Sequence, residues 1–412
     1  MSSEERRAFG ARVADLRKQK GMTQGELAAA IGRTASWLSQ VERGIQPVNR
    51  LDVLRLLADG LGVPLQVLQP DAPPPAEAGA MTDPQTNDLD QARLVLSGHP
   101  ALDALLNPST TFQPDALPGL SAAVDSIWEL AHHSQFAELS AAIGPLVPRL
   151  ELAARTAAPE QQRDIHALLA RTYQALAAAF VRQNEADAAW VAADRAIREA
   201  ELAGDPIGVF AGIYRLCHAF VRLKHLDQAE HAAATAVNVL RRYIETNEPT
   251  PEHLSVLGSL HLTLALVHAR AGERASARQQ IDAARDIGRR LAEDRNDFNL
   301  EFGPTNVEIH AISTAVDLGD AGEALDIAKG LRAEGLSPER QARLLMDIGR
   351  AHVQRRQHAD ALDCLLRAEA LAPEMIRTHA ASRAAVRDLA LAAGRSASDE
   401  LRALAERTDS LA

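Results

Sequence analysis

Residues 22–44 read MTQGELAAAIGRTASWLSQVERG, and this stretch decides the fold of the N-terminal part of the chain. Thr23 and Glu26 have the spacing of a capping box, which predicts the start of a first short helix. The apolar residues that follow have helical spacing: Leu27, Ala28 and Ile31. Gly32 is expected at the left-handed C-terminal position that ends this helix. The stretch therefore predicts two short helices joined by a tight turn.

The second helix is expected to expose a surface suited to DNA. Thr34 can cap its first turn, and Leu38 and Val41 give it an apolar edge. The remaining face carries mostly small or polar residues: Ala35, Ser36, Trp37, Ser39, Gln40 and Arg43. In the major groove glutamine pairs with adenine and arginine with guanine, so this face can read bases. Trp37 fits two positions equally well, half-buried in the domain core or against a phosphate backbone.

The quoted stretch resembles the Cro/repressor-type (XRE) helix-turn-helix family. The string TASWLSQVERG has the spacing of the family's recognition helix, and FGARVADLRKQKGMTQ upstream matches its first helix and turn. Downstream, RLDVLRLLADGLGVPLQVL matches its closing helices. The resemblance covers about residues 5–69 and implies a five-helix DNA-binding domain over residues 1–69, with double-stranded DNA as partner.

The resemblance also implies roles for individual residues. The expected DNA contacts are Gln24, Arg33, Thr34, Ala35, Ser36, Trp37, Ser39, Gln40 and Arg43. Among them, Gln24 is implied to contact a phosphate, whereas Ala35, Ser36 and Gln40 are implied to face base edges.

Two further positions refine this expectation. Arg17 is implied to pair with Glu42 beneath the recognition helix, as a structural ion pair. Relatives often carry a longer side chain at the position of Ala35, so specificity is expected to depend on Gln40, Arg33 and Trp37.

The charge distribution fits a DNA-binding head on an acidic body. The formal net charge is −11, yet residues 1–69 carry +3 and the remainder −14. The two cysteines, Cys217 and Cys364, are too few for a disulfide framework or a zinc site and are expected to be buried thiols. With no secretory segment at the N-terminus and no run of 18 apolar residues, we expect a cytoplasmic protein without a membrane partner.

The rest of the chain reads as a linker and a helical repeat domain. Residues 70–88 are rich in Pro, Ala and small polar residues, which is typical of a linker. Helical periodicity dominates residues 89–412, and the fold class is expected to be all-α. Small residues recur at equivalent positions of five helix pairs: Ala189, Ala229, Ala277, Ala324 and Ala361. Residues 117–157 and 374–410 are expected to form a first pair and a capping pair.

This spacing is similar to that of tetratricopeptide (TPR) repeats, with a unit longer than the standard one. The combination resembles, in architecture, the bacterial peptide-sensing regulators that join an XRE head to a TPR body. The resemblance implies that the body dimerises and senses a peptide or small-molecule signal.

One repeat position carries a recurring arginine: Arg182, Arg222 and Arg270. If these arginines line the concave groove, they can clamp carboxylates of a peptide or a small acidic ligand. Alternatively, they only complement the helix dipole in the last turn of each first helix. The other concave candidates are Tyr214, His218, Leu262, Leu266, Asn306 and Arg350. An asparagine there can hold a peptide backbone through its amide.

The sequence contains no motif for catalysis. It has no phosphate loop, no nucleophile elbow and no metal-ligand spacing, so we expect no catalytic residue, no metal and no cofactor. Two functions remain open. The first is a homodimeric, sequence-specific transcription regulator, and the second is a TPR adaptor that docks a protein partner and uses the helix-turn-helix for localisation.

Overall fold

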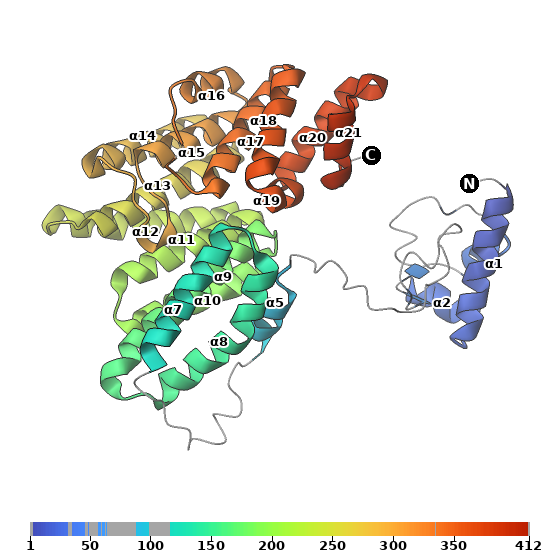
Figure 1. The fold of residues 1–412 in the computed structure, drawn as a ribbon, viewed down its shortest axis with the longest axis horizontal. Coiled ribbons are helices and arrows are strands. Elements are labelled where there is room, and N and C mark those ends of the chain that lie inside the picture. Colours follow the sequence, from blue (N-terminus) through green and yellow to red (C-terminus); the bar gives the residue numbers. More distant parts are fainter. Residues whose placement is uncertain are drawn as a thin grey trace. The chain divides into compact units, whose positions relative to one another are not determined.

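The computed structural model shows an all-α protein (Figure 1). The residues that it describes are 3–31, 35–45, 48, 57–58, 60–61, 63, 88–98, 116–333 and 335–410. Over these residues the only β-type pairing is an isolated bridge between Arg295 and Phe302, which confirms the expected fold class. The chain divides into two compact units, Met1–Pro84 and Gln85–Ala412. The expected linker lies outside the described residues up to position 87.

The N-terminal unit begins with three helices, α1 (Ser3–Gln19), α2 (Gln24–Ala30) and α3 (Ala35–Glu42). The capping box is present at the start of α2. The backbone amide of Thr23 donates to Glu26 at 2.7 Å, and the amide of Glu26 donates to the Thr23 hydroxyl at 3.2 Å. Gly32 and Thr34, expected to end α2 and to cap α3, lie outside the described residues.

Close backbone contacts fix how α3 sits against α1. A Cβ atom at Gly10 would lie 2.3 Å from the carbonyl oxygen of Val41, so only glycine permits this approach. Gly44, just after α3, has a φ of +70°, and a Cβ there would lie 2.8 Å from the Cα of Arg7. The enclosed core is aliphatic apart from one aromatic ring, and includes Phe9, Val13, Leu27, Ile31, Leu38 and Val41.

The second unit is built from helix pairs. In chain order its helices are α5 (Asp90–Ser97), α7 (Leu117–His132), α8 (Phe136–Thr156), α9 (Pro159–Arg182), α10 (Ala186–Ala203), α11 (Pro206–Arg222), α12 (Leu226–Thr246), α13 (Pro251–Ala271), α14 (Arg274–Leu291), η3 (Asp297–Asn299), α15 (Pro304–Asp317), α16 (Ala321–Ala328), α17 (Pro338–Gln354), α18 (His358–Leu371), α19 (Pro373–Thr378), α20 (Ala380–Ala393), η4 (Gly394–Ser396) and α21 (Asp399–Arg407).

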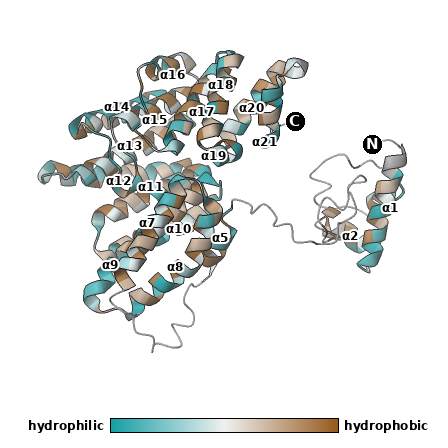
Figure 2. Ribbon diagram, viewed as in Figure 1, coloured by the Kyte–Doolittle hydropathy of each residue, from teal (hydrophilic) through white to brown (hydrophobic). Residues whose placement is uncertain are grey.

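These pairs stack as a TPR-like solenoid. The first helices of successive pairs, α7, α9, α11, α13, α15 and α17, each pack against the next one in this order. Each second helix packs against its own partner and against the first helix of the following pair, as α10 does with α9 and α11. Because the first helix of each pair packs against the first helix of the next pair, the first helices form one continuous inner layer. Most helices carry hydrophobic and hydrophilic residues on different faces (Figure 2).

The predicted repeat pairs coincide with observed helix pairs, from α9–α10 through α17–α18. The five alanines expected at the helix–helix contacts are fully buried: Ala189, Ala229, Ala277, Ala324 and Ala361. The first predicted pair is α7–α8, and the C-terminal segment forms α19, α20 and α21. One helix of the described chain, α13, is long and apolar enough to cross a membrane, but 83% of its apolar stretch is buried inside the solenoid.

An ion pair fastens α1 to α3. The Arg17 guanidinium donates to both carboxylate oxygens of Glu42, at 2.6 and 3.0 Å, and to the carbonyl of Met22 at 2.7 Å. Gln24 donates its amide to the same carboxylate at 2.6 Å. Burial works to raise the pKa of Glu42, but the hydrogen bonds from Arg17 and Gln24 outweigh it and hold the pKa below its ordinary value. The ion pair expected from the sequence is thus present, and Arg17 is only 8% exposed.

Removing this arginine should destabilise the N-terminal unit. Arg17→Ala leaves the Glu42 carboxylate buried without its cation, which costs about 3–5 kcal/mol, a large share of what a domain of this size has. Hydrogen exchange of the full chain should become much faster in α1–α3 and stay unchanged in α13. Lys20→Ala, which removes an exposed charge just after the same helix, is the control. If α1–α3 were protected from hydrogen exchange equally in Arg17→Ala and in wild type, the Arg17–Glu42 ion pair would not be structural.

Candidate functional site

The first candidate site is the exposed face of α3. Ala35 is exposed, Ser39 and Gln40 are partly exposed, and the exposed Arg43 donates its Nε to the carbonyl of Ser39 at 3.2 Å. Trp37 is half-buried and packs against the core of the unit. This placement favours the core alternative for its ring.

Part of the expected DNA-binding set lies beyond what the structure describes. Arg33 and Thr34 are outside the described residues, and so is the side chain of Ser36. Gln24 lies at the start of α2, and its amide nitrogen holds Glu42. The phosphate contact implied for Gln24 therefore stays a prediction.

The second candidate site is a cavity of about 150 Å³ inside the solenoid. It lies on the inner layer, between side chains of α9, α11, α13, α15, α17 and α19, with His379 at the α19–α20 junction. Six of the residues singled out from the sequence line it: Arg182, Tyr214, His218, Arg222, Leu266 and Arg270. The recurring arginines end α9 and α11 and come just before the end of α13, so stacking brings their last turns together.

Three expected ligand residues lie elsewhere. Leu262 is buried in the core of the solenoid, among the residues that α13 turns toward its neighbours. Asn306 is 2% exposed, in the first turn of α15, and is not among the residues that line the cavity. Arg350 lies behind the cavity wall, where it donates to Asp317 at 2.6 Å and to Asp347 at 2.7 Å. These three residues belong to first helices of their pairs, but their side chains are not among those that line the cavity.

The cavity holds three arginines that the sequence reasoning missed, Arg215, Arg340 and Arg343. The sequence contained a signal for them in the spacing of arginines along α11 and α17. Arg215 precedes Arg222 by two helical turns, and Arg340 and Arg343 share one face of α17 with Arg350. In all, six arginines and only two carboxylates, Glu339 and Asp347, line the cavity.

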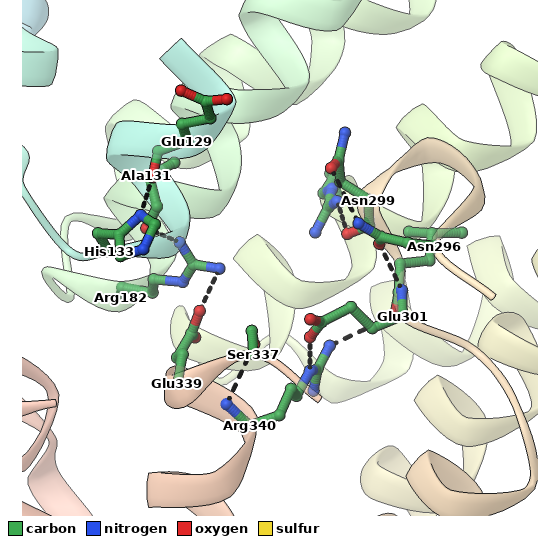
Figure 3. Close-up of polar contacts among 12 residues, drawn as sticks. Glu129, Ala131, His133, Arg182, Asn296, Asn299, Glu301, Ser337, Glu339 and Arg340 are labelled. Atoms are coloured by element: carbon green, nitrogen blue, oxygen red, sulfur yellow. Dashed lines mark hydrogen bonds and ion pairs between the residues drawn. The ribbon is translucent and has the colours of Figure 1, made fainter. Parts of the chain in front are cut away.

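Four of these arginines have carboxylate partners in the described chain, and one partner comes from a distant repeat. Arg182 reaches Glu339 of α17 at 2.5 Å and also donates to the carbonyl of Ala131 at 2.7 Å (Figure 3). Arg340 donates to Glu301 at 2.8 Å. The first of these contacts joins α9 to α17, so it ties an early repeat to a late one across the cavity.

Arg215 is held differently, by backbone carbonyls. It is 8% exposed, donates to the carbonyls of Phe298 and Asn299 at 3.2 and 2.9 Å, and has a buried Nε with no hydrogen-bond partner among the described residues. Its guanidinium also lies 5.3 Å from the ring centre of Trp128 and 5.2 Å from that of Tyr214. The loop that supplies the carbonyls has left-handed backbone at Phe298, with a φ of 50°, a costly conformation for a bulky residue.

Burial and neighbouring positive charges lower the pKa values of two arginines in the cavity wall. Burial, reinforced by Arg343 and Arg270, lowers the pKa of Arg222 to about 10. Burial also lowers the pKa of Arg215 to about 10. Asp347 shows the reverse: burial works to raise its pKa, but Arg343 and Arg350 outweigh burial and lower it. The cavity is therefore a positive region inside an acidic body.

Three histidines in the cavity wall stay neutral for the same reason. Burial, followed by the neighbouring arginines, lowers the pKa of His310 to about 3 and brings those of His218 and His379 well below the ordinary value. Neutral imidazoles add hydrogen-bonding atoms without adding charge. One of them, His218 Nε2, is buried without a partner in the described chain.

These histidines should make the body less stable in mild acid. The unfolded chain takes up protons below the ordinary histidine pKa of about 6.5, whereas the folded wall does not, so stability falls as the pH falls through 6.5. At pH 5.5 the loss is roughly 1 kcal/mol for each histidine. Thermal melts at pH 7.5 and 5.5 should show the decrease, and it should be smaller in His310→Gln. The exposed His231→Gln should behave like wild type. A decrease of the same size in His310→Gln would contradict this account.

Comparison with known proteins bears mainly on the N-terminal unit. Residues 8–70 match the family model of a helix-turn-helix domain. This match and the observed helix pairs define the class of protein: a chain with an N-terminal helix-turn-helix domain and a TPR-like helical-repeat body. No curated protein matches the sequence.

Solved structures resemble the chain only distantly. PlcR of Bacillus thuringiensis, in complex with the peptide PapR7 and DNA, is 14% identical, with 92% of this chain and 99% of PlcR covered and a TM-score of 0.35. Cut9, from the APC/C hetero-tetramer Cut9–Hcn1, is 13% identical, with 97% of this chain and 69% of that chain covered and a TM-score of 0.34. A point mutant of PrgX is 10% identical, with coverage of 97% and 99% and a TM-score of 0.20.

Proposed function

We propose that this protein is a cytoplasmic, homodimeric transcription regulator that binds a DNA operator through α3 and senses a peptide or small acidic signal in the cavity of its TPR-like body. The domain boundaries that we propose are residues 1–69 for the DNA-binding domain, 70–88 for the linker and 89–412 for the sensing and dimerisation domain. The observation that carries the proposal is the arginine-lined cavity in a chain that also has a helix-turn-helix domain.

Several features support the sensing part. The cavity wall contains side chains from six helices between α9 and α19, so a ligand that binds there contacts several repeats together. The Arg182–Glu339 contact between α9 and α17 is one place where a bound anion would compete with a carboxylate of the protein. A ligand that prefers one arrangement of the repeats shifts the equilibrium toward that arrangement. If the two arrangements place the DNA-binding domains differently, the affinity for DNA changes as well.

Dimerisation is supported by apolar side chains on the second helices of the pairs. Trp190 and Val191 on α10 and Val239 and Tyr243 on α12 are exposed, each between 44% and 53%. Large exposed apolar residues of this kind are frequent where protein surfaces associate. A dimer would place two recognition helices on two half-sites about 34 Å apart, or a multiple of this distance.

The full chain should accordingly bind an operator much more tightly than its N-terminal unit. Two linked recognition helices gain roughly 10²–10⁴-fold over one when both half-sites are engaged. Electrophoretic mobility shifts on a palindromic site should show this difference between the full chain and a chain that ends at Pro84. Binding should also weaken steeply with salt because phosphate contacts release counterions. Equal affinity of the two chains would contradict a dimeric mode of binding.

The side chains of α3 should carry the sequence preference. Gln40→Ala removes the expected base contact, so the preference at one base pair should drop by about 1–3 kcal/mol. Gln24→Ala should weaken binding to all sequences alike, because a phosphate contact carries no sequence information. Selection of binding sites from random DNA tests both variants, with wild type as reference. A uniform loss in both variants would show that α3 is not the reading helix, and failure of the wild type to select any site would favour the adaptor function.

A further inference from the structure

The arginines of the cavity differ in whether the protein itself neutralises them. Arg182, Arg340 and Arg343 contact Glu339, Glu301 and Asp347, respectively. Arg270 lies 4.0 Å from Asp317, which Arg350 already holds at 2.6 Å. Within the described part of the chain, no carboxylate forms an ion pair with Arg215 or Arg222. The protein's own carboxylates are therefore too few for the arginines around the cavity.

The arginines that the protein leaves unbalanced belong to different repeats. Arg222 of α11, Arg270 of α13 and Arg343 of α17 come from three different repeats and all line the cavity, and after burial the neighbouring arginines help to lower the pKa of Arg222 and of Arg270. His379 faces the same three arginines. Burying like charges together is unfavourable unless something neutralises them, and Arg222 has no partner of its own in the described residues.

The size of the cavity limits what the neutralising group can be. A cavity of about 150 Å³ is below the usual range of roughly 300–1,000 Å³ for drug-sized ligands. A cavity of this volume in another protein is known to hold a molecule of the size of benzene. A space of this size encloses a compact oxyanion but not a peptide of several residues, so of the two proposed signals the small acidic one is favoured.

The geometry points to a specific ligand class: we propose that Arg222, Arg270 and Arg343 bind a compact oxyanion with two or more negative charges, a phosphate-type anion or a small polycarboxylate. Arginine suits this role because its planar fork donates two parallel hydrogen bonds to a phosphate or a carboxylate. His218 is neutral, and its Nε2, buried without a partner in the described chain, can supply a further hydrogen bond. The inference rests on the proposed function only in that the bound anion would be the signal.

The test measures anion binding by the full chain. Thermal melts in chloride of matched ionic strength are compared with melts in ~10 mM inorganic pyrophosphate, in ~10 mM citrate and in an acidic hexapeptide at the same concentration. Specific binding should raise Tm by at least ~3 °C with pyrophosphate or citrate, and the hexapeptide should have no effect beyond that of chloride. Pyrophosphate alone would identify a phosphate site, citrate alone a carboxylate site, and both a general oxyanion site.

The decisive variant is Arg222→Gln with Arg270→Gln, which should weaken the binding of either anion at least tenfold in isothermal titration calorimetry. This variant should fold, because Asp317 keeps Arg350 and because removing Arg222 relieves repulsion at a residue that has no ion-pair partner in the described chain. Its Tm in chloride should equal or exceed that of wild type. The matched control is Arg198→Gln with Arg289→Gln, which removes two charges whose side chains are 71% and 77% exposed.

Three results would overturn the proposal: no stabilisation by either oxyanion, equal stabilisation of the double variant, or stabilisation by the hexapeptide alone. A lower Tm of the double variant in chloride would also count against it, because the arginines would then be structural. An anion that binds the cavity without altering DNA binding would leave this site intact and contradict only its role as a signal. Loss of DNA binding altogether would contradict the proposed function and leave the anion site standing.

Discussion

Close packing of paired helices through alanine is the constraint on which the rest of the body depends. Ala189, Ala229 and Ala277 are fully buried, and residues this small let two helices approach without a layer of large side chains between them. The first helices then stack directly on one another as an inner layer. The C-terminal turns of three successive first helices, α9, α11 and α13, come together, and each of these turns carries an arginine. The cationic cavity is thus a consequence of the repeat geometry as much as of the individual residues.

This arrangement has an energetic cost that the protein only partly offsets. Glu339, Glu301 and Asp347 neutralise part of the wall, and the Arg182–Glu339 contact connects repeats that are far apart in sequence. Arg222 is only partly exposed, and it has a lowered pKa and no carboxylate partner in the described chain. Sites that bind a ligand commonly keep such unfavourable arrangements, because the ligand completes the interaction when it arrives. A sensor gains from this, since the difference between the empty and the occupied cavity is then large.

The sequence predicted the local features well. The capping box at Thr23, the pair of Arg17 with Glu42 and the five helix pairs all depend on residues close in sequence or on a strong family resemblance. The cavity was predicted only in outline, because its members meet through superhelical stacking. Arg215 and Arg340 were missed, although they share helix faces with Arg222 and Arg350, and Asn306 was placed on the inner layer but packs away from the cavity. Periodicity indicates which face of a helix is turned inward, whereas the depth of each side chain depends on the neighbouring repeat.

The central claim is that an anion in the body controls DNA binding by the head. The most direct measurement is the dissociation constant of the full chain for its selected DNA site, at fixed ionic strength, with and without a saturating oxyanion that binds the cavity. A coupling of about 1–3 kcal/mol changes this constant 5- to 150-fold in wild type. The account predicts a change in this range in wild type and none in Arg222→Gln with Arg270→Gln. A constant that stays the same in wild type with the anion bound, or that shifts equally in both proteins, would contradict it.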